Sequence, residues 1–350
     1  MVIFVTGPSG FIGSNLLRRL IKERYRVIGL FRNPPDTPLS GHLAIKDFCN
    51  LSGAKQPHNA GGHLEVVKGD INHPDTYITA LSQTNCVFHC AAHIGFRKAD
   101  YDLAYLINVE GTRALLDACH KVGVSKVVHL SACAVLGYSE SVHRLIDESS
   151  KPIIKRDNAY AYTKTLAEGI AFEYAAKGLD VSIANIATVY GAGDKRLNSG
   201  SVIKTVYEGK AKVIPQGGTS FVAVDDLVEG LILMSQRGKA GERYILCSEN
   251  MTYSDLFKRI AWALGLKRRF IVLPKSFKYP AIFLAGLIER LLPAKSNGVN
   301  LISEQLIRES FGYKYYNNQK ARSELGWHPL ISLEEAVRDA FDYYRSQGLI

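Results

Sequence analysis

The sequence predicts a doubly wound α/β fold, in which a parallel sheet carries helices on both faces and a smaller C-terminal lobe is interleaved with it. Three observations support this class. Short apolar runs alternate with stretches of helical periodicity through the first half of the chain, as in repeated βαβ units. A glycine-rich turn joins the first apolar run to the first helix. A chain of 350 residues can bury one large core beside a smaller lobe.

The first strand and the first helix frame this glycine turn. Residues 2–5 form an apolar run typical of a buried parallel strand, and residues 14–21 have helical spacing. Such a turn lets the backbone approach a pyrophosphate, and the helix N-terminus offers unpaired N–H groups. The alternative is a tight turn without a ligand, which the flanking strand and helix disfavour. The predicted dinucleotide site here comprises Gly7, Ser9, Gly10, Phe11, Ile12 and Gly13.

The second strand, residues 26–31, ends where the type of dinucleotide is recognised. An Asp or Glu at this place usually binds a free ribose 2′-hydroxyl, but here Phe31 is followed by Arg32. An arginine can bind a 2′-phosphate with two parallel hydrogen bonds. The alternative is that Arg32 is a solvated loop charge. Arg32 therefore favours NADP as the cofactor and leaves NAD open.

Three further strands and one helix complete the first half of the chain. Apolar runs at 64–70, 85–92 and 126–132 predict the strands, and residues 103–121 predict a helix. Asp70 lies at the end of its predicted strand, where its carboxylate can accept a hydrogen bond from the adenine amine. The next predicted strand ends in small residues, which leave room for the cofactor. The cofactor site is therefore expected to include Asp70, Ile71, Ala91 and Ala92.

A tyrosine and a lysine supply the predicted chemistry. Residues 159–176 have helical periodicity, and Tyr160 and Lys164 share one face because they are four positions apart. A free phenol has a pKa of about 10 and is a poor base at neutral pH. A neighbouring ammonium favours the phenolate and lowers that pKa towards a useful range. The pair therefore predicts proton transfer that accompanies hydride transfer. A surface pair without function is the alternative.

Seven motifs occur in one order along the chain. They are TGPSGFIGS from Thr6, Gly69-Asp70, NVEGT from Asn108, YAYTK from Tyr160, ATVYGAGD from Ala187, FVAVDDL from Phe221 and ARSELGWHP from Ala321. In this set and order the sequence resembles the extended short-chain dehydrogenase/reductase family over essentially its whole length. The resemblance implies a Rossmann nucleotide domain, Tyr160 as the proton-transfer residue with Lys164 as its partner, and Asn108 as a support of the active site. It also places Thr188 and Val189 beneath the nicotinamide amide.

One departure from the family pattern concerns the residue that polarises the substrate carbonyl. The family usually has a Ser or Thr three residues before the valine of a V-x-G, and that position is Ala132 here. An alanine cannot donate a hydrogen bond. Ser131 lies one residue earlier and, by strand alternation, is expected to point away unless a bulge redirects it. We therefore consider three cases: a recruited Ser131, a substitute group or water, and weak or absent catalysis.

A second departure concerns the substrate. Relatives that act on nucleotide sugars often have an arginine before the F-V-x-V-D-D stretch, but Gln216 to Ser220 contain none. The sequence looks more like the branch with 3β-hydroxysteroid dehydrogenases and dihydroflavonol reductases. It predicts an NADP-dependent oxidoreductase acting on an alcohol or ketone of a small, largely apolar molecule that is sterol-, flavonoid- or polyketide-like. The alternatives are a nucleotide-sugar epimerase or dehydratase, and, because of Ala132, a non-catalytic dinucleotide-binding protein.

The same resemblance suggests how the chain divides. Residues 1–191 and 219–248 are expected to form the NADP-binding domain. Residues 192–218 and 249–350 are expected to form the substrate lobe and a C-terminal helix. Within that lobe, residues 276–292 are the most apolar stretch, but the uncharged part is far shorter than the roughly 20 residues that cross a bilayer. This stretch predicts a covered core helix, a lid on an apolar substrate, or peripheral membrane contact.

Composition limits the remaining partners. The six cysteines show no paired spacing and are expected to be reduced thiols of a cytoplasmic protein, with no metal site. A net charge of +10 suits an anionic cofactor, substrate or membrane surface. No nucleic-acid-binding motif accompanies this charge, so a small-molecule substrate and no nucleic acid are expected. A monomer or a homodimer is expected.

Overall fold

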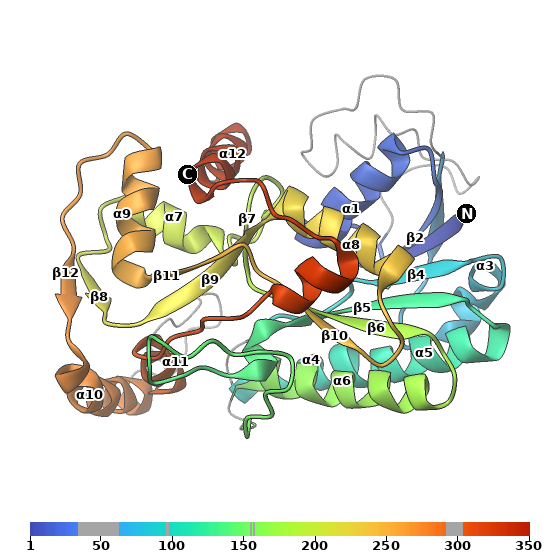
Figure 1. Cartoon of the computed structure of the whole chain (residues 1–350), viewed down its shortest axis with the longest axis horizontal. Coiled ribbons are helices and arrows are strands. Elements are labelled where there is room, and N and C mark those ends of the chain that lie inside the picture. Colours follow the sequence, from blue (N-terminus) through green and yellow to red (C-terminus); the bar gives the residue numbers. More distant parts are fainter. Residues whose placement is uncertain (34–62, 96–97, 155, 157, 292–303) are drawn as a thin grey trace.

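The computed structural model describes residues 1–33, 63–95, 98–154, 156, 158–291 and 304–350 (Figure 1). Its centre is a seven-stranded sheet of order β10-β6-β5-β4-β1-β2-β3, in which neighbouring strands pair in parallel. These strands are β1 (Val2–Thr6), β2 (Arg26–Phe31), β3 (His63–Lys68), β4 (Cys86–His89), β5 (Lys126–Ala132), β6 (Val181–Ile186) and β10 (Arg243–Leu246). The predicted doubly wound Rossmann fold is thereby confirmed.

Helices cover both faces of this sheet (Figure 1). Helix α1 (Phe11–Lys22) packs with α8 (Val224–Arg237) on one face, and α5 (Gly111–Val122) packs with α6 (Ala159–Ala176) on the other. Two apolar clusters correspond to these faces, because side chains alternate along each strand. On β5, for example, Val128 and Leu130 belong to the α1–α8 cluster, whereas Val127 belongs to the α5–α6 cluster. The two faces of β5 therefore lead to different helices.

The second lobe lies at the end of the molecule opposite the N-terminus (Figure 1). Besides the seven-stranded sheet, the chain forms a three-stranded sheet of order β11-β9-β7 and a parallel pair of β12 with β8. These strands are β7 (Thr188–Tyr190), β8 (Val213–Pro215), β9 (Gly218–Ala223), β11 (Glu249–Thr252) and β12 (Ile271–Leu273). The helices of this half are α7 (Gly200–Tyr207), α9 (Tyr253–Ala263), α10 (Lys278–Leu291), α11 (Glu304–Ser310) and α12 (Leu333–Ser346). The proposed assignment of chain segments to two domains stays a prediction.

Local structure differs from the sequence prediction around residue 108. The segment expected to be one helix consists of α4 (Tyr101–Tyr105), a π-helical turn (Leu106–Glu110) and α5. A π-helical turn adds a residue to the helical repeat and occurs frequently at functional sites. Here it contains Asn108, whose side chain is buried. A short helix α3 (Ile78–Leu81) completes the described helices of the nucleotide domain.

Candidate active site and cofactor cleft

A cavity of about 760 Å³ lies at the carboxyl ends of β1, β2, β4, β5 and β6 and extends to the second lobe. Ligands of doubly wound folds bind at this edge of the sheet. The predicted residues that line the cavity are Gly7, Ser9, Gly10, Phe11, Ile12, Gly13, Arg32, Asp70, Ile71, Ala91, Ala92, Ser131, Tyr160, Lys164, Thr188 and Val189. The fold therefore brings together residues that are up to 182 positions apart. Only Asn108, among the predicted site residues, does not line it.

The glycine turn is closely packed against neighbouring backbone. Gly7 has a φ of +65°, and a Cβ there would lie 2.8 Å from the backbone nitrogen of Ala91. A Cβ at Gly13 would lie 2.2 Å from the carbonyl oxygen of Gly7. Helix α1 then starts after Gly10, which has no side chain to cap the first turn. The Gly10 N–H donates to the Gly7 carbonyl at 3.0 Å, which closes the turn, and the N–H groups of the first turn of α1 that follow it suit an anion such as a dinucleotide pyrophosphate.

The predicted proton-transfer pair, Tyr160 and Lys164, lies on the first two turns of α6. The side chain of Asn158 caps this helix by accepting from the Ala161 N–H at 3.1 Å. Burial of the phenol, reinforced by the nearby Cys133, raises the pKa of Tyr160 to about 12. This direction is opposite to the predicted one. The Lys164 ammonium donates to the carbonyl oxygen of Leu130 at 2.5 Å, so its charge is directed at β5 rather than at the phenol.

Lys164 is itself strongly affected by burial. Its side chain is 3% exposed, and desolvation lowers the pKa of Lys164 to about 8, although the Glu168 carboxylate opposes this shift. Glu168 lies one turn further along α6, is fully buried, and forms a 2.6 Å ion pair with Arg243. The same carboxylate accepts from the Asn185 amide at 2.6 Å. Glu168, Asn185 and Arg243 therefore form a hydrogen-bonded polar cluster one helical turn beyond Lys164.

Asn108 supports the site from outside the cavity. Its amide oxygen accepts from the His93 N–H at 2.7 Å, and its amide nitrogen donates to the His93 carbonyl at 3.0 Å. The same nitrogen donates to the hydroxyl of Thr163 on α6 at 3.0 Å. Asn108 therefore connects the segment after β4 to the helix that carries the tyrosine and lysine. These contacts agree with the expected supporting role of Asn108, which stays a prediction.

The structure shows to which faces of the sheet Ser131 and Ala132 belong at the end of β5. The pairing with β6 continues regularly through both residues, with Ser131 opposite Asn185 and Ala132 opposite Ile186, so this segment contains no bulge. Asn185 reaches Glu168 on α6, and Ser131 therefore faces α6 as well. Its hydroxyl is buried, borders the cavity, and has no hydrogen-bond partner among the described residues. A donor is thus available on the tyrosine side of the strand without a bulge.

Several residues that line the cavity were not predicted from the sequence. They include Lys195 and Arg196, which follow the ATVYGAGD motif, Thr219 and Ser220 on β9, and Lys314 and Tyr316 near the C-terminal end of the chain. The position of Lys195 and Arg196 directly after a recognised motif could have indicated that they line the cavity. Nothing in local spacing indicates the others, because they reach the cavity through the packing of distant segments.

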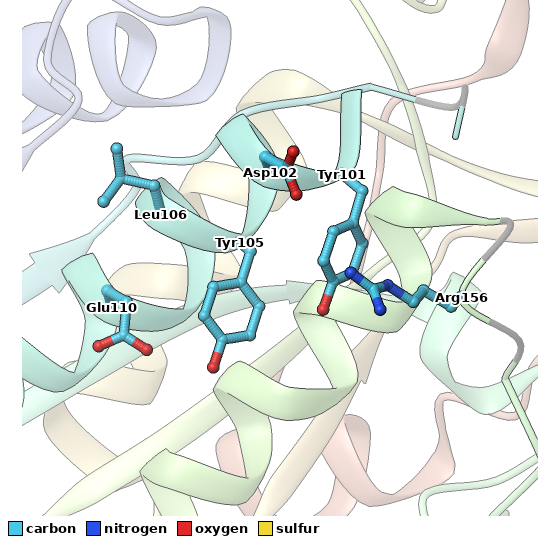
Figure 2. Close-up of a pocket in the computed structure, with 6 residues that line it drawn as sticks. All are labelled: Tyr101, Asp102, Tyr105, Leu106, Glu110 and Arg156. Atoms are coloured by element: carbon cyan, nitrogen blue, oxygen red, sulfur yellow. The ribbon is translucent and has the colours of Figure 1, made fainter. Parts of the chain in front are cut away.

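A second, more open hollow of about 490 Å³ lies on the outer surface beside α4 and the π-helical turn. Figure 2 shows that the ring of Tyr101 lies against the guanidinium of Arg156, and the distance from its Cζ to the ring centroid is 3.8 Å. Glu110, next to the phenol, raises the pKa of Tyr105. This hollow contains none of the predicted site residues.

Comparisons with known proteins extend over both halves of the chain. A profile described as the NAD dependent epimerase/dehydratase family matches residues 3–247. The putative dihydroflavonol 4-reductase of Synechocystis sp. is 28% identical over 358 residues, which cover 99% of this chain and 95% of that protein. The sterol demethylase protein B of Methylococcus capsulatus is 27% identical over 352 residues and is matched over the whole of both chains. The crystal structure of gox2253 is similar with a TM-score of 0.80 and 29% identity, over 99% of this chain and 98% of that one.

Proposed function

Because this chain belongs to the NAD dependent epimerase/dehydratase family and is an NAD(P)-dependent enzyme of the extended short-chain dehydrogenase/reductase type, we propose that it interconverts an alcohol and a ketone on a small, largely apolar substrate. One observation carries this proposal. Tyr160, Lys164 and the glycine turn border the same cavity of about 760 Å³. The turn would hold the pyrophosphate of the dinucleotide, which supplies or accepts a hydride when bound.

The residues of this chain have distinct parts in the reaction. Tyr160 gives a proton to the substrate oxygen during reduction and takes it back during oxidation. Lys164 would hold the nicotinamide ribose and, once its ammonium turns towards the cavity, lower the pKa of the phenol. Ser131 offers the one buried hydroxyl near α6 that lacks a partner among the described residues, so it is the donor suited to polarise the carbonyl. Ala132 contributes only a methyl group.

The proposed cofactor is NADP. Arg32 borders the cavity at the end of β2, where a ribose 2′-phosphate would lie, and its guanidinium suits that group. Titration calorimetry should find tighter binding of NADPH than of NADH, and Arg32→Ala should remove most of the difference. Equal affinities for the unsubstituted protein would contradict the preference and leave NAD as the cofactor.

The proposed substrate class follows from the lining beyond the nicotinamide position. The side chains of Ile94, Ile107, Ala134 and Val202 are apolar, and Thr219 and Ser220 stand where relatives that bind nucleotide sugars often have an arginine. The sterol and flavonoid names of the relatives agree with an apolar substrate. A screen of sterol-, flavonoid- and polyketide-like alcohols and ketones, followed by NADPH absorbance, tests this directly.

An epimerase or dehydratase of nucleotide sugars is the second candidate, which the family description favours. Such enzymes return the hydride to the same substrate and keep the dinucleotide bound through turnover. Protein purified with stoichiometric dinucleotide, together with binding of UDP-sugars, would support this candidate against the first. A protein that binds NADPH but turns over neither class would support the non-catalytic alternative.

We also propose peripheral membrane contact through residues 276–292, as far as they are described. Helix α10 buries Ile282 and Ala285 but exposes Tyr279 (72%) and Phe283 (75%) on its outer face, together with much of Leu287. Helix α10 lies at the edge of the second lobe (Figure 1). Exposed apolar patches mark interaction sites. None of the described helices is long and apolar enough to span a bilayer.

Liposome sedimentation tests this contact. The protein should bind vesicles that contain anionic lipid at low salt, and Tyr279→Ser/Phe283→Ser should reduce the bound fraction severalfold. Leu330→Ser is the matched control, since Leu330 is an exposed apolar residue outside α10. Equal sedimentation of all three proteins would remove α10 from membrane binding. The oligomeric state, monomer or homodimer, stays a prediction for light scattering.

A further inference from the structure

The loop between β7 and α7 lies on the first turns of the nucleotide-binding helix. The side-chain amide of Asn15 on α1 donates to the carbonyl of Ala192 at 2.9 Å. Gly193 follows with a φ of +107°, and a Cβ there would lie 2.9 Å from the Asn15 amide nitrogen and 3.4 Å from the ring of Phe11. Phe11 and Asn15 belong to the two turns that follow the glycine cradle. The loop therefore meets α1 at the end where a dinucleotide pyrophosphate binds.

A buried carboxylate fixes the shape of this loop. Asp194 is 1% exposed and accepts three backbone N–H groups, from Asn198 at 3.1 Å and from Ser199 and Gly200 at 3.0 Å. Hydrogen bonds from several N–H groups satisfy a buried carboxylate without a cation. The loop is thus held at Ala192 by α1 and at Asp194 by its own backbone. Lys195 and Arg196 come directly after Asp194 in the chain and form an exposed basic pair.

This basic pair borders the same cavity as the glycine turn and Arg32. No described carboxylate forms an ion pair with Arg196. Burial lowers the pKa of His93, and the charges of Arg196 and Arg32, from the two halves of the molecule, lower it further. Although the Lys195 residue is exposed, partial burial of its ammonium lowers the pKa of Lys195. Cations gathered in this way repel one another, and an anion between them relieves the repulsion.

We propose that Lys195 and Arg196 bind the phosphate groups of the dinucleotide from the side of the second lobe, opposite the N-terminus of α1. This inference rests on the proposed dinucleotide-dependent function. The glycine turn offers neutral N–H groups to the pyrophosphate and Arg32 offers one guanidinium, whereas the phosphate groups of NADP carry about four negative charges. The basic pair would supply the missing positive charge. Because the pair belongs to the substrate lobe, cofactor binding would also hold that lobe on the nucleotide domain.

The test compares Lys195→Ala, Arg196→Ala and the double variant with Lys212→Ala, an exposed lysine of the same half of the chain outside the cavity. Kd values for NADPH and NADH are measured by nucleotide fluorescence at low and at moderate salt. We expect the double variant to bind both nucleotides at least about tenfold more weakly and with a shallower salt dependence. Arg196→Lys should retain much of the affinity, and Lys212→Ala should match the unsubstituted protein.

The outcomes distinguish this inference from its premise. Unchanged Kd values of NADPH and NADH for the double variant at low salt would overturn the inference. If the KM of an anionic substrate rose while these Kd values stayed unchanged, the pair would bind the substrate, and the inference would be overturned as well. If the unsubstituted protein bound neither NADPH nor NADH, the proposed function itself would fail. Circular dichroism of each variant shows whether the loop substitutions have left the fold intact.

Discussion

Replacing Lys164 with methionine should stabilise the folded protein while removing its activity. The ammonium is almost completely buried, and burial lowers the pKa of Lys164 from 10.5 to about 8 despite the opposing carboxylate of Glu168. The charged form is therefore less favourable in the folded state than in the unfolded chain. Methionine has a similar length and fills the space without a charge.

The magnitude follows from the difference in pKa between the two states. A fall from 10.5 to about 8 corresponds to about 3 kcal/mol against folding at about pH 7, where Lys164 is protonated in both states. Loss of the hydrogen bond to the Leu130 carbonyl costs about 1 kcal/mol. We therefore expect Lys164→Met to be about 2 kcal/mol more stable at about pH 7.

The sign of the pH dependence is also determined. Between pH 8 and pH 10.5 the unfolded chain binds more protons at this site than the folded protein does, so the stability of the unsubstituted protein rises with pH through this window. The penalty is fully present below about pH 8 and falls below about 1 kcal/mol by about pH 10. The advantage of the methionine variant should disappear over the same range.

Urea unfolding of both proteins at about pH 7 and at about pH 9.5 measures this difference. Lys258→Met is the control, because Lys258 is exposed on α9 and its substitution should change stability by no more than about 0.5 kcal/mol at either pH. A methionine variant that is less stable at neutral pH would refute the reasoning. So would a stability difference that is the same at both pH values, since it would not come from the proton.

Three further predictions concern the cavity. Tyr160→Phe should lower kcat by about 10²–10⁴-fold and leave the Kd of NADPH nearly unchanged, so normal turnover would exclude the phenol from the reaction. Ser131→Ala should lower kcat/KM by about 10²–10³-fold with Ala132→Ser nearly neutral, and the reverse pattern would show that the donor belongs at Ala132. Gly13→Ala should weaken NADPH binding, because its Cβ would lie 2.2 Å from a backbone oxygen. Gly169→Ala, whose Cβ meets open space on α6, is the control and should stabilise the helix by about 1 kcal/mol.

Much of the site was predictable because its chemistry is local in the chain. The glycine turn needs a strand, three glycines and a helix in succession, and the Tyr160–Lys164 pair needs only a helix with the right spacing. Both are confirmed as structural elements, at β1–α1 and on α6. The resemblance to the extended short-chain dehydrogenase/reductase family is confirmed as well, whereas the role of each site residue stays a prediction.

Other features of the site depend on groups that the chain brings together from far apart. The direction of the Lys164 ammonium was unpredictable, because its acceptor is a backbone carbonyl 34 positions away. Strand alternation correctly placed Ser131 and Ala132 on different faces, but the expectation that Ser131 points away from the site unless a bulge redirects it was wrong, because its face is the one covered by α6. Burial, which raises the pKa of Tyr160 and lowers that of Lys164, exists only in the assembled fold.

The sequence by itself therefore determined the fold class, the glycine turn between strand and helix, and the tyrosine–lysine pair on one helix, because hydrophobic periodicity and fixed spacing act over a few residues. Only the tertiary structure decided that Lys195 and Arg196 reach the cofactor cleft. Their position depends on a loop fastened to Asn15, 177 positions before Ala192, and shaped by the buried carboxylate of Asp194. Contacts of that range leave no periodic signal in the chain, and they arise only when the two lobes pack together.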